Sequence, residues 1–285
     1  MLIGAHVSVS GGYPKTLEYA RSVDAECIQI FAKSPRQWRG AVLDPDAAAS
    51  FVEARAEMGG MPLFTHTAYL INLAAADDAM WEKSVYALSD EITRGHLLGA
   101  DGVVTHLGSN PSEDIGLTAK RIAEGVVAAF ELCGECTARL LLENTAGAGA
   151  TYGGSAVELG AVVRASGLNS DILGVCIDTC HAHAAGIDVS GSAGWTDLLD
   201  AIDSECGEGR VGLIHANDCK FGLGEHKDRH EWIGDGFIGA AGFSAMMAQD
   251  RLASTCAVLE MPGEIPDKDS VNIARLKVLR EQNRS

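Results

Sequence analysis

The sequence predicts a (β/α)₈ barrel, or TIM barrel, that forms a single domain over residues 1–285. Short apolar runs recur along the chain, and a segment with helical periodicity follows each of them. The length of 285 residues agrees with the usual size of this fold, ~250 residues. No linker, low-complexity tract or change of composition divides the chain. A doubly wound open sheet is the alternative arrangement of the same units.

Eight strand–helix units follow from these patterns. The strands are expected at Leu2–His6, Glu26–Phe31, Pro62–His66, Gly102–His106, Arg139–Glu143, Ile172–Asp178, Val211–His215 and Cys256–Glu260. The helices are expected at Pro14–Val23, Pro45–Met58, Met80–Leu98, Leu117–Cys133, Ala156–Ser166, Thr196–Cys206, Ala240–Asp250 and Ser270–Glu281. Glycine-rich segments follow the fifth and sixth strands, where strand-to-helix loops belong.

Composition limits the function and the location. An apolar content of 47% is enough for a full core. The net charge of −17 argues against broad affinity for nucleic acid, although a local basic patch remains possible and bound cations would offset part of the charge. The N-terminus lacks the features of a signal peptide, and no apolar run is long enough to cross a bilayer. We therefore expect a soluble, cytoplasmic protein without membrane attachment.

The eight cysteines are scattered, several of them within apolar runs, which favours reduced, buried thiols over a disulfide framework. Cys133 and Cys136 form the only C-x-x-C motif, and no second pair near it indicates a zinc or redox site. Cys180 is expected to pack under its loop rather than to bind a metal.

Ionisable residues end six consecutive strands of the predicted barrel. In this fold the carboxyl ends of the strands carry the functional residues. Any single one of them could be a helix cap or a core histidine, but six on one rim would be costly in repulsion and desolvation unless cations held them together. These strand-end residues are His66, His106, Glu143, Asp178, His215 and Glu260.

Two loops add further ligands. His181 follows the sixth strand, and an alternating D-x-H after the seventh strand places Asp228 and His230 on one side of an extended backbone. Nine nitrogen and oxygen donors suit two or three ions with a bridging carboxylate, an arrangement used to hydrolyse phosphate esters. Zinc is favoured, and manganese, iron or cobalt stay open. The other histidines are weaker candidates: His6 as an outer residue, His183 and His226 as orienting residues, and His96 as a surface residue.

A basic loop with an aromatic residue follows the second strand. Lys33, Arg36 and Arg39 surround Trp38, a combination that could hold a phosphate backbone while a side chain stacks or wedges at a base step. Tyr69 and Leu70, just after His66, form a second exposed candidate. The alternative is a solvated loop with Trp38 packed on the barrel and a second segment that belongs to the core.

Over nearly its whole length the sequence resembles the endonuclease IV family of apurinic/apyrimidinic endonucleases. Its strand-six and D-R-H motifs are highly specific. The departures are Ser34 and Pro35 before the Arg-Gln-Trp and Leu107 after the strand-four histidine, and they bear on loop geometry rather than on the metal ligands. The matching segments are Ile3–Ser8, Arg36–Trp38, His66, Tyr69–Leu73, Leu142–Gly147, Gly174–Ala182, His215–Asp218 and Asp228–His230.

The resemblance implies a TIM barrel with three zinc ions per chain and a role for each candidate ligand. It implies that Glu143 bridges two ions and helps to hold the nucleophilic hydroxide. His66 and His106 would complete the first ion, and Asp178, His215 and Glu260 the second. His181, Asp228 and His230 would hold the third. Manganese could occupy one or more of these sites.

The implied reaction belongs to base excision repair. A zinc-activated hydroxide would hydrolyse the phosphodiester 5′ to an abasic site in double-stranded DNA, leaving a 3′-hydroxyl and a 5′ deoxyribose phosphate, and 3′-blocked ends would also be trimmed. Arg36, Tyr69 and Leu70 match positions on loops that enter the DNA and expose the flipped nucleotide. A monomer is expected.

Three other functions place different demands on the residues. A sugar isomerase or epimerase on the same barrel would use the ends of strands five to eight, but it has no need of His66, His106 or the D-x-H loop. A noncatalytic DNA-binding module does not explain an intact ligand set. A dinucleotide cofactor is not expected, because Gly147-Ala-Gly149 lacks the third glycine of the fingerprint and follows strand five.

Overall fold

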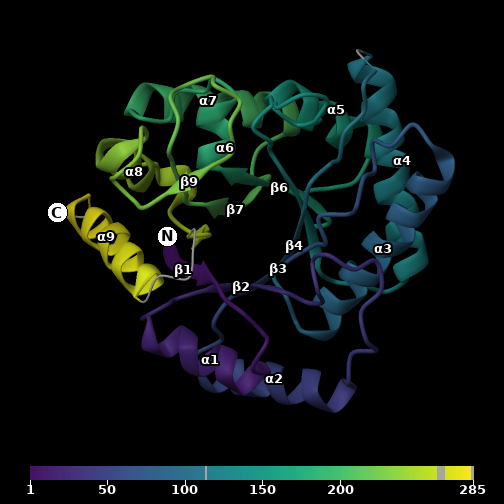
Figure 1. The fold of residues 1–285 in the computed structure, drawn as a ribbon, viewed down its shortest axis with the longest axis horizontal. Helices are drawn as coiled ribbons and strands as arrows, with labels where there is room; N and C mark the ends of the chain where they lie inside the picture. The colour runs from purple at the N-terminus through teal and green to yellow at the C-terminus, as the bar shows by residue number, and fades with distance from the viewer. Residues whose placement is uncertain (113, 262–266, 284–285) are drawn as a thin grey trace.

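In the computed structural model, which describes residues 1–112, 114–261 and 267–283, eight parallel strands close into a barrel. Figure 1 shows the helices as a ring around these strands, with α9 beside β1. The predicted TIM barrel is confirmed, and the open-sheet alternative is excluded by the closure. Around the barrel the strands are β1 (Leu2–His6), β10 (Cys256–Leu259), β7 (Val211–His215), β6 (Leu173–Asp178), β5 (Arg139–Glu143), β4 (Gly102–Thr105), β3 (Leu63–His66) and β2 (Ile28–Phe31).

All the predicted helices are present, and several begin at a side-chain cap. Asp44, Asp77, Asp114 and Ser155 each accept a hydrogen bond from a backbone N–H of the first turn. Within the described residues, each helix is too short or too polar to cross a bilayer. The long helices are α1 (Tyr13–Ser22), α2 (Pro45–Glu57), α3 (Asp78–Leu97), α4 (Ile115–Cys133), α5 (Ala156–Ser166), α7 (Ser192–Cys206), α8 (Gly239–Met247) and α9 (Lys268–Gln282).

Three local features differ from the expectations. The helix expected at Ala240–Asp250 ends at Met247, and a short 3₁₀ turn, Asp250–Leu252, follows it. The segment after β6 forms a short helix, α6 (Thr179–Ala184), where a loop was expected. The loop after β7 contains a small antiparallel hairpin of β8 (Asp218–Cys219) and β9 (His230–Glu231). Both α6 and this hairpin carry candidate ligands.

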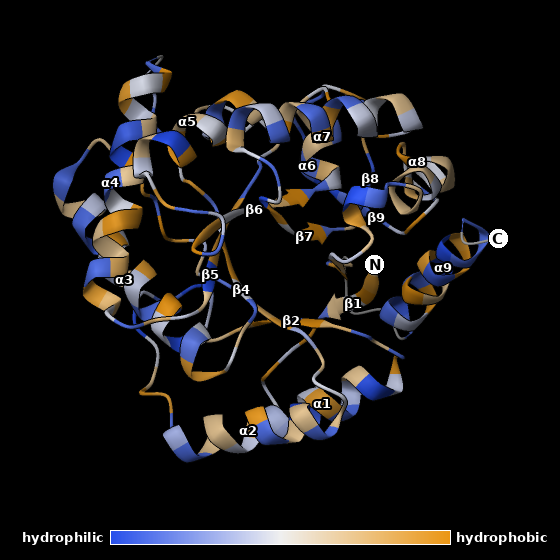
Figure 2. Cartoon of the chain, turned by 180° about the vertical axis from the view of Figure 1, so that it is seen from behind, coloured by the Kyte–Doolittle hydropathy of each residue, from blue (hydrophilic) through white to orange (hydrophobic). Residues whose placement is uncertain are grey.

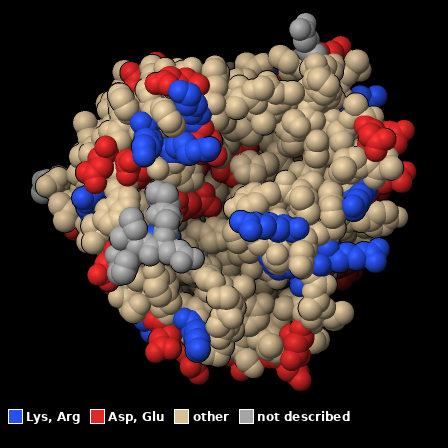
Figure 3. Space-filling view, in the orientation of Figure 1, with Lys and Arg blue, Asp and Glu red and all other residues tan. Residues whose placement is uncertain are grey.

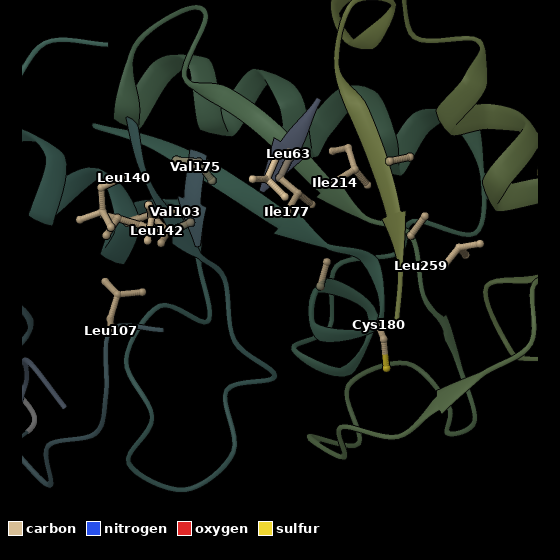
Figure 4. Packing of buried hydrophobic residues seen from close by; sticks show 14 of the residues in the cluster. Leu63, Val103, Leu107, Leu140, Leu142, Val175, Ile177, Cys180, Ile214 and Leu259 are labelled. Carbon is tan, nitrogen blue, oxygen red and sulfur yellow. The ribbon is translucent and has the colours of Figure 1, made fainter. Parts of the chain in front are cut away.

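The apolar core has two parts because successive side chains of a strand point to opposite faces. Half of the strand side chains point outward and pack under the helices; Figure 4 shows Leu63, Val103, Leu140, Leu142 and Val175 in this layer. Figure 2 shows the strands as mostly apolar, within a ring of helices that mix polar and apolar residues. The inward-pointing cluster consists of Cys27, Phe64, Val104, Leu141, Cys176, Leu213, Cys256 and Val258.

The cysteine prediction is confirmed in part. Among the described residues, Cys27, Cys176, Cys180, Cys206, Cys219 and Cys256 are buried free thiols. Cys133 and Cys136, at the end of α4, are joined by a disulfide, so the expectation of reduced thiols is wrong for this pair. Their positions differ by three, and the chain leaves the helix between them at Gly134, where φ is 74°. This turn brings the two side chains together.

Candidate metal centre

The strand-end residues share one face because of the two-residue period of a strand. Leu141, Cys176, Leu213 and Val258 belong to the cluster inside the barrel, and the residue two positions later in each strand lies above it. Those residues are Glu143, Asp178, His215 and Glu260, and the same count from Phe64 and Val104 gives His66 and His106. One layer of apolar side chains therefore supports a layer of acids and imidazoles.

Glu143 lies between two groups of histidines. Its Oε2 atom is 3.1 Å from His66 Nε2 and 3.5 Å from His106 Nε2. Its Oε1 atom is 3.0 Å from His215 Nδ1 and 3.4 Å from His181 Nδ1. The carboxylate is almost completely buried. It can therefore act as a bridging ligand, with one oxygen on each side.

A second group shares Glu143 with three residues from β6, β7 and the end of β10. His215 Nδ1 lies 3.6 Å from Glu260 Oε2 and 4.0 Å from Asp178 Oδ2. The four ligand atoms of this group all lie within 4.8 Å of one another. Three carboxylates and one imidazole are ligands that zinc and manganese both accept.

The third group joins α6 to the β8–β9 hairpin. Asp228 Oδ2 is 3.2 Å from His181 Nε2, and Asp228 Oδ1 is 3.3 Å from His230 Nε2. Asp178 belongs to this neighbourhood as well, since its Oδ2 atom is 3.7 Å from His230 Nε2. Cys180 Sγ comes within 4.8 Å of ligand atoms of Asp228 and His230. The structure thus brings all nine predicted ligands into three adjoining groups.

Local structure fixes these side chains. Asp178 caps α6 by accepting a hydrogen bond from the backbone N–H of His181, which places the two residues side by side. Asp218, in β8, is fully buried, and its carboxylate accepts hydrogen bonds from the backbone N–H groups of Cys219, Gly234, Gly236, Ile238 and Gly239. A Cβ atom at Gly236 would lie 2.5 Å from Asp218 Oδ1. Asp218 therefore sets the course of the chain after the hairpin.

The spacing of the nine side chains fits metal ions. Bonds of ~2.0–2.1 Å place two ligand atoms of one tetrahedral zinc about 3.3 Å apart. The distances from Glu143 to His66, from His181 to Asp228 and from His230 to Asp228 are 3.1, 3.2 and 3.3 Å. Carboxylates that face imidazole nitrogens at such distances need a proton or a cation between them. The residues present therefore fit bound divalent metals.

The pKa shifts show how strongly these groups are coupled. Burial by itself would raise the pKa of Glu143, but the charges of His106 and His215 and hydrogen bonds with His181 and His215 hold it well below its usual range. Burial by itself would lower the pKa of His230, but a hydrogen bond with Asp228 and the charge of Asp178 raise it to about 9. Protons and metal ions would therefore compete for these groups.

Three polar residues that sequence reasoning missed contact the ligands directly. Asn144 Oδ1 accepts a hydrogen bond from the backbone N–H of Asp178, and Asn217 Nδ2 donates one to Asp178 Oδ2. Gln29, in β2, lies within hydrogen-bonding distance of His215, Glu260 and His6. A polar residue at an inward position of an apolar strand was the signal for Gln29, and asparagines next to strand ends were the signal for the other two.

The remaining histidines have different surroundings. His6 Nδ1 lies 3.2 Å from Glu260 Oε1, as an outer residue would. His226 Nδ1 contacts the carbonyl oxygen of Ala146, and His96, half-buried on α3, contacts Thr137 Oγ1. His183 is buried on α6, and neither ring nitrogen has a hydrogen-bond partner among the described residues. His6 therefore contacts a candidate ligand directly, as expected of an outer residue.

The candidate DNA-contacting residues lie on two adjoining loops after β2 and β3. The backbone N–H of Tyr69 donates to the carbonyl oxygen of Pro35, which joins the loops. Arg36 is exposed, Tyr69 is 61% exposed and Leu70 is half-buried. The Tyr69 ring lies 5.9 Å from the ring of His66, so this loop borders the candidate metal centre.

Trp38 and Lys33 face the body of the protein. Trp38 is half-buried against the core, and the ammonium group of Lys83 lies 4.2 Å from its ring centroid. Lys33 is buried, and its Nζ atom is 2.7 Å from Asp90 Oδ2 and 3.4 Å from Glu91 Oε1. The interpretation of Lys33 as a phosphate-binding cation is therefore wrong, since its charge is used within the fold.

The face turned to the viewer in Figure 3 is hollowed at its centre. Acidic side chains lie in and around the hollow, and separate groups of Lys and Arg side chains lie on opposite sides of it. The excess of negative charge is thus interrupted by local positive patches on this face. Such patches are compatible with a polyanionic ligand despite the net charge of −17.

Comparisons with known proteins identify the family of the chain. Residues 17–282 match the family model described as xylose isomerase-like TIM barrel. The chain is 39% identical over 282 residues to the probable endonuclease 4 of Streptomyces coelicolor, covering 98% of this chain and 95% of that protein. A crystal structure of endonuclease IV from Thermus thermophilus superposes with a TM-score of 0.87 and 36% identity, covering 99% of this chain and 100% of the other.

A D-tagatose 3-epimerase-like protein is also similar in structure. Its TM-score is 0.75 at 18% identity, with 98% of that chain and all of this one covered, and at this identity the likeness concerns the fold alone. The endonuclease 4 of Streptomyces coelicolor and the endonuclease IV of Thermus thermophilus match this chain along nearly its full length. The chain therefore belongs to the endonuclease IV family of enzymes, within the xylose isomerase-like TIM barrels.

Proposed function

We propose that this protein is a DNA repair endonuclease that hydrolyses the phosphodiester 5′ to abasic sites in double-stranded DNA and trims 3′-blocked ends. The observation that carries the proposal is the convergence of nine acids and histidines in three adjoining groups at the carboxyl end of the barrel. Membership of the endonuclease IV family supports the same reaction. The proposal includes a cytoplasmic location and a monomeric state.

Three zinc ions are the proposed cofactors, with manganese able to occupy one or more sites. His66, His106 and Glu143 would hold the first, Glu143, Asp178, His215 and Glu260 the second, and His181, Asp228 and His230 the third. When bound, the ions would supply Lewis acidity that activates water near neutral pH and offsets charge on the phosphate. The nitrogen and oxygen donors of the site suit both metals.

The residues of the chain orient the reaction around Glu143. Because its two oxygens face different histidine groups, this carboxylate fixes the spacing of the first and second sites and would help to hold the attacking water between them. Its pKa, held well below the usual range by neighbouring histidines, keeps it ionised. No separate side-chain base is needed, and deep burial of Glu143 limits access of bulk water.

Substrate binding is assigned to the loops after β2 and β3. Tyr69 is exposed beside His66, where its ring can stack on a base next to the lesion, and Arg36 can pair with a phosphate. Leu70, half-buried next to Tyr69, can occupy the gap left by a flipped nucleotide. Trp38 is a fourth candidate, and its contact with Lys83 favours a role in supporting the loop.

Two groups of side chains distinguish this proposal from the sugar epimerase alternative. Glu143, Asp178, His215 and Glu260 alone would suit a single-metal sugar site. The additional cluster of His181, Asp228 and His230, and the pair His66 and His106 on the other side of Glu143, have no use in such a site. The proposal therefore rests on the groups that flank the central one.

The test combines metal analysis with cleavage of a defined duplex. Purified protein should contain up to three metal ions per chain and should cut an abasic duplex on the 5′ side of the lesion. Prolonged treatment with a chelator should abolish cutting, and added zinc or manganese should restore it. About one metal per chain together with no cleavage would overturn the proposal and favour the sugar reaction.

A further inference from the structure

Gln29 is a buried amide within an otherwise apolar strand. Its side chain points into the barrel, since Cys27, two residues earlier, belongs to the interior cluster, and the residue is completely buried. A buried amide without partners would be costly, so its contacts decide why glutamine stands here. The neighbours Ile28 and Ile30 point outward into the main core. Gln29 is thus the one polar side chain of β2.

The amide reaches two candidate metal ligands from across the barrel. Gln29 Oε1 lies 2.8 Å from His215 Nε2, and Gln29 Nε2 lies 2.9 Å from Glu260 Oε1 and 2.9 Å from His6 Nδ1. Strand β1 stands between β2 and β10, so the bonds to His215 and Glu260 connect strands that are not neighbours in the sheet, whereas His6 lies on the neighbouring strand β1. One side chain therefore links β2 to the ends of β7 and β10.

The contacts define which way the amide faces. In the opposite orientation the carbonyl oxygen of Gln29 would meet the carboxylate of Glu260 at 2.9 Å, two acceptors without a hydrogen between them. The NH₂ group therefore donates to Glu260, and the carbonyl oxygen accepts from His215. It follows that Nε2 of His215 carries the hydrogen.

The consequence for His215 is an oriented lone pair. With the hydrogen on Nε2, the Nδ1 atom of the neutral ring is free to bind a metal, and this atom faces Glu143 Oε1 at 3.0 Å and Glu260 Oε2 at 3.6 Å. The bond to Glu260 Oε1 leaves the Oε2 atom of that carboxylate on the same side as His215 Nδ1. His215 Nδ1 and Glu260 Oε2 therefore both face the second candidate metal site.

We infer that Gln29 is a positioning residue for the second metal site: it holds the ring of His215 and the carboxylate of Glu260 in the orientation that binds the ion. This inference rests on the proposed function. Gln29 is fully buried and does not reach the DNA-facing surface, so it acts through these two ligands. Partners of this kind in other metal sites contribute about 10- to 100-fold in metal affinity or activity.

The experiment compares Gln29→Met with the wild-type protein. Methionine keeps an unbranched side chain of similar length and removes the three hydrogen bonds of the amide, to His215, Glu260 and His6. Metal-loaded protein is mixed with excess chelator, and metal release is followed over time. We expect about one ion per chain to leave roughly 10- to 100-fold faster in the variant, with a lower kcat for abasic-duplex cleavage and an unchanged KM. Gln249→Met, at a half-buried glutamine that bonds Ala245, is the matched control.

A second variant distinguishes positioning from packing. Gln29→Glu keeps an acceptor for His215, and its second oxygen, which would face Glu260, can share a proton with that carboxylate, so the variant should release metal more slowly than Gln29→Met. The thermal midpoint of each metal-free protein reports the structural effect of the substitution by itself. It should change less than the metal-loaded midpoint, because bound metal stabilises the native state more when it binds more tightly.

The outcomes separate this inference from the proposed function. Wild-type protein that bound metal and cut the duplex, together with a Gln29→Met variant that released metal at the wild-type rate, would overturn the inference alone. Equal release by Gln29→Met and Gln29→Glu, with equal losses of midpoint in the metal-free proteins, would also overturn it and assign Gln29 to packing. Wild-type protein without metal or cleavage would overturn the proposed function and the inference with it.

Discussion

The two ends of the barrel use charged residues in opposite ways. At the amino end, Arg139 donates hydrogen bonds to the carbonyl oxygens of Gly209 and Arg210, and Arg210 donates to those of Leu173 and Leu168. At the carboxyl end, buried carboxylates face histidine nitrogens at 3.0–3.6 Å. Apart from Arg139 Nε, which has no hydrogen-bond partner among the described residues, these guanidinium groups bond backbone carbonyls, whereas the groups at the carboxyl end need protons or cations.

The contrast separates stability from function in one fold. Guanidinium groups that donate hydrogen bonds to backbone carbonyls stabilise the barrel. Acids and histidines that converge at the carboxyl end, with no protein cation of the described chain between them, leave a place for a metal ion. The family assignment agrees with that use. Substitutions at the two ends should therefore differ in kind: one set should change metal content and catalysis, and the other the free energy of unfolding.

The largest effect is expected for Glu143→Gln. The substitution removes the charge that the first and second metal groups share. We expect metal content to fall and cleavage of an abasic duplex to drop by about 10³-fold, or ~4 kcal/mol at 1.36 kcal/mol per tenfold. Glu53→Gln, at an exposed position of α2, is the control and should behave as wild type. Full activity of Glu143→Gln would remove the carboxylate from the proposed centre.

Asp228→Asn should have the next largest effect. Its two oxygens contact His181 and His230, so the neutral amide weakens the third group and leaves the other two complete. The expected result is one ion fewer per chain and cleavage about 10²-fold slower, equivalent to ~2.7 kcal/mol. Metal analysis and single-turnover cleavage measure the two quantities. Asp197→Asn, on the exposed side of α7, serves as the comparison; unaltered stoichiometry in Asp228→Asn would contradict a third metal site.

Arg139→Met tests the opposite end of the barrel. The guanidinium group fills space beside Gly174, where a Cβ atom would lie 2.6 Å from it, and it bonds two carbonyl oxygens. Loss of charged hydrogen bonds should lower the free energy of unfolding by ~1.5–3 kcal/mol, with metal content and cleavage rate intact. Chemical denaturation at equilibrium gives the first value. An Arg139→Met variant with wild-type stability but less bound metal would contradict the assignment of stability to the amino end and metal binding to the carboxyl end.

The smallest effect is expected for Tyr69→Ala. This side chain is 61% exposed beside the metal centre, and Tyr86, on α3, is 65% exposed outside it, so Tyr86→Ala is a matched control. Loss of stacking at Tyr69 should weaken binding to an abasic duplex by about tenfold, since a stacked base contributes ~1–3 kcal/mol. Fluorescence anisotropy would measure the affinity. Equal behaviour of the two variants would mean that the DNA lies elsewhere.

The fold and the positions of the candidate ligands could be predicted because both depend on local periodicity. A strand alternates its side chains, so the end of an apolar run shows which residue reaches the rim. Glu143 and Asp178, for example, end runs of this kind, and the structure brings them to one place. In the D-x-H motif the same alternation put Asp228 and His230 together.

Contacts between distant segments could not be predicted in this way. The fate of Lys33 depends on Asp90 and Glu91, which lie on α3 more than fifty residues later. The partners of Gln29 come from the ends of β7 and β10. The helix α6 is only six residues long and carries two histidines, so its sequence has too little apolar periodicity to indicate a helix. Each of these features is set by tertiary packing.

The hydrogen bonds of Asp218 have a consequence for the order of assembly. Five backbone N–H groups converge on one buried carboxylate, so the segment that returns from the hairpin is held by the apoprotein alone. Asp228 and His230 then sit on a loop anchored at both ends before any cation arrives. An ion that binds there would not have to order a flexible loop. The entropy cost of binding is therefore smaller, and the affinity for the ion is higher.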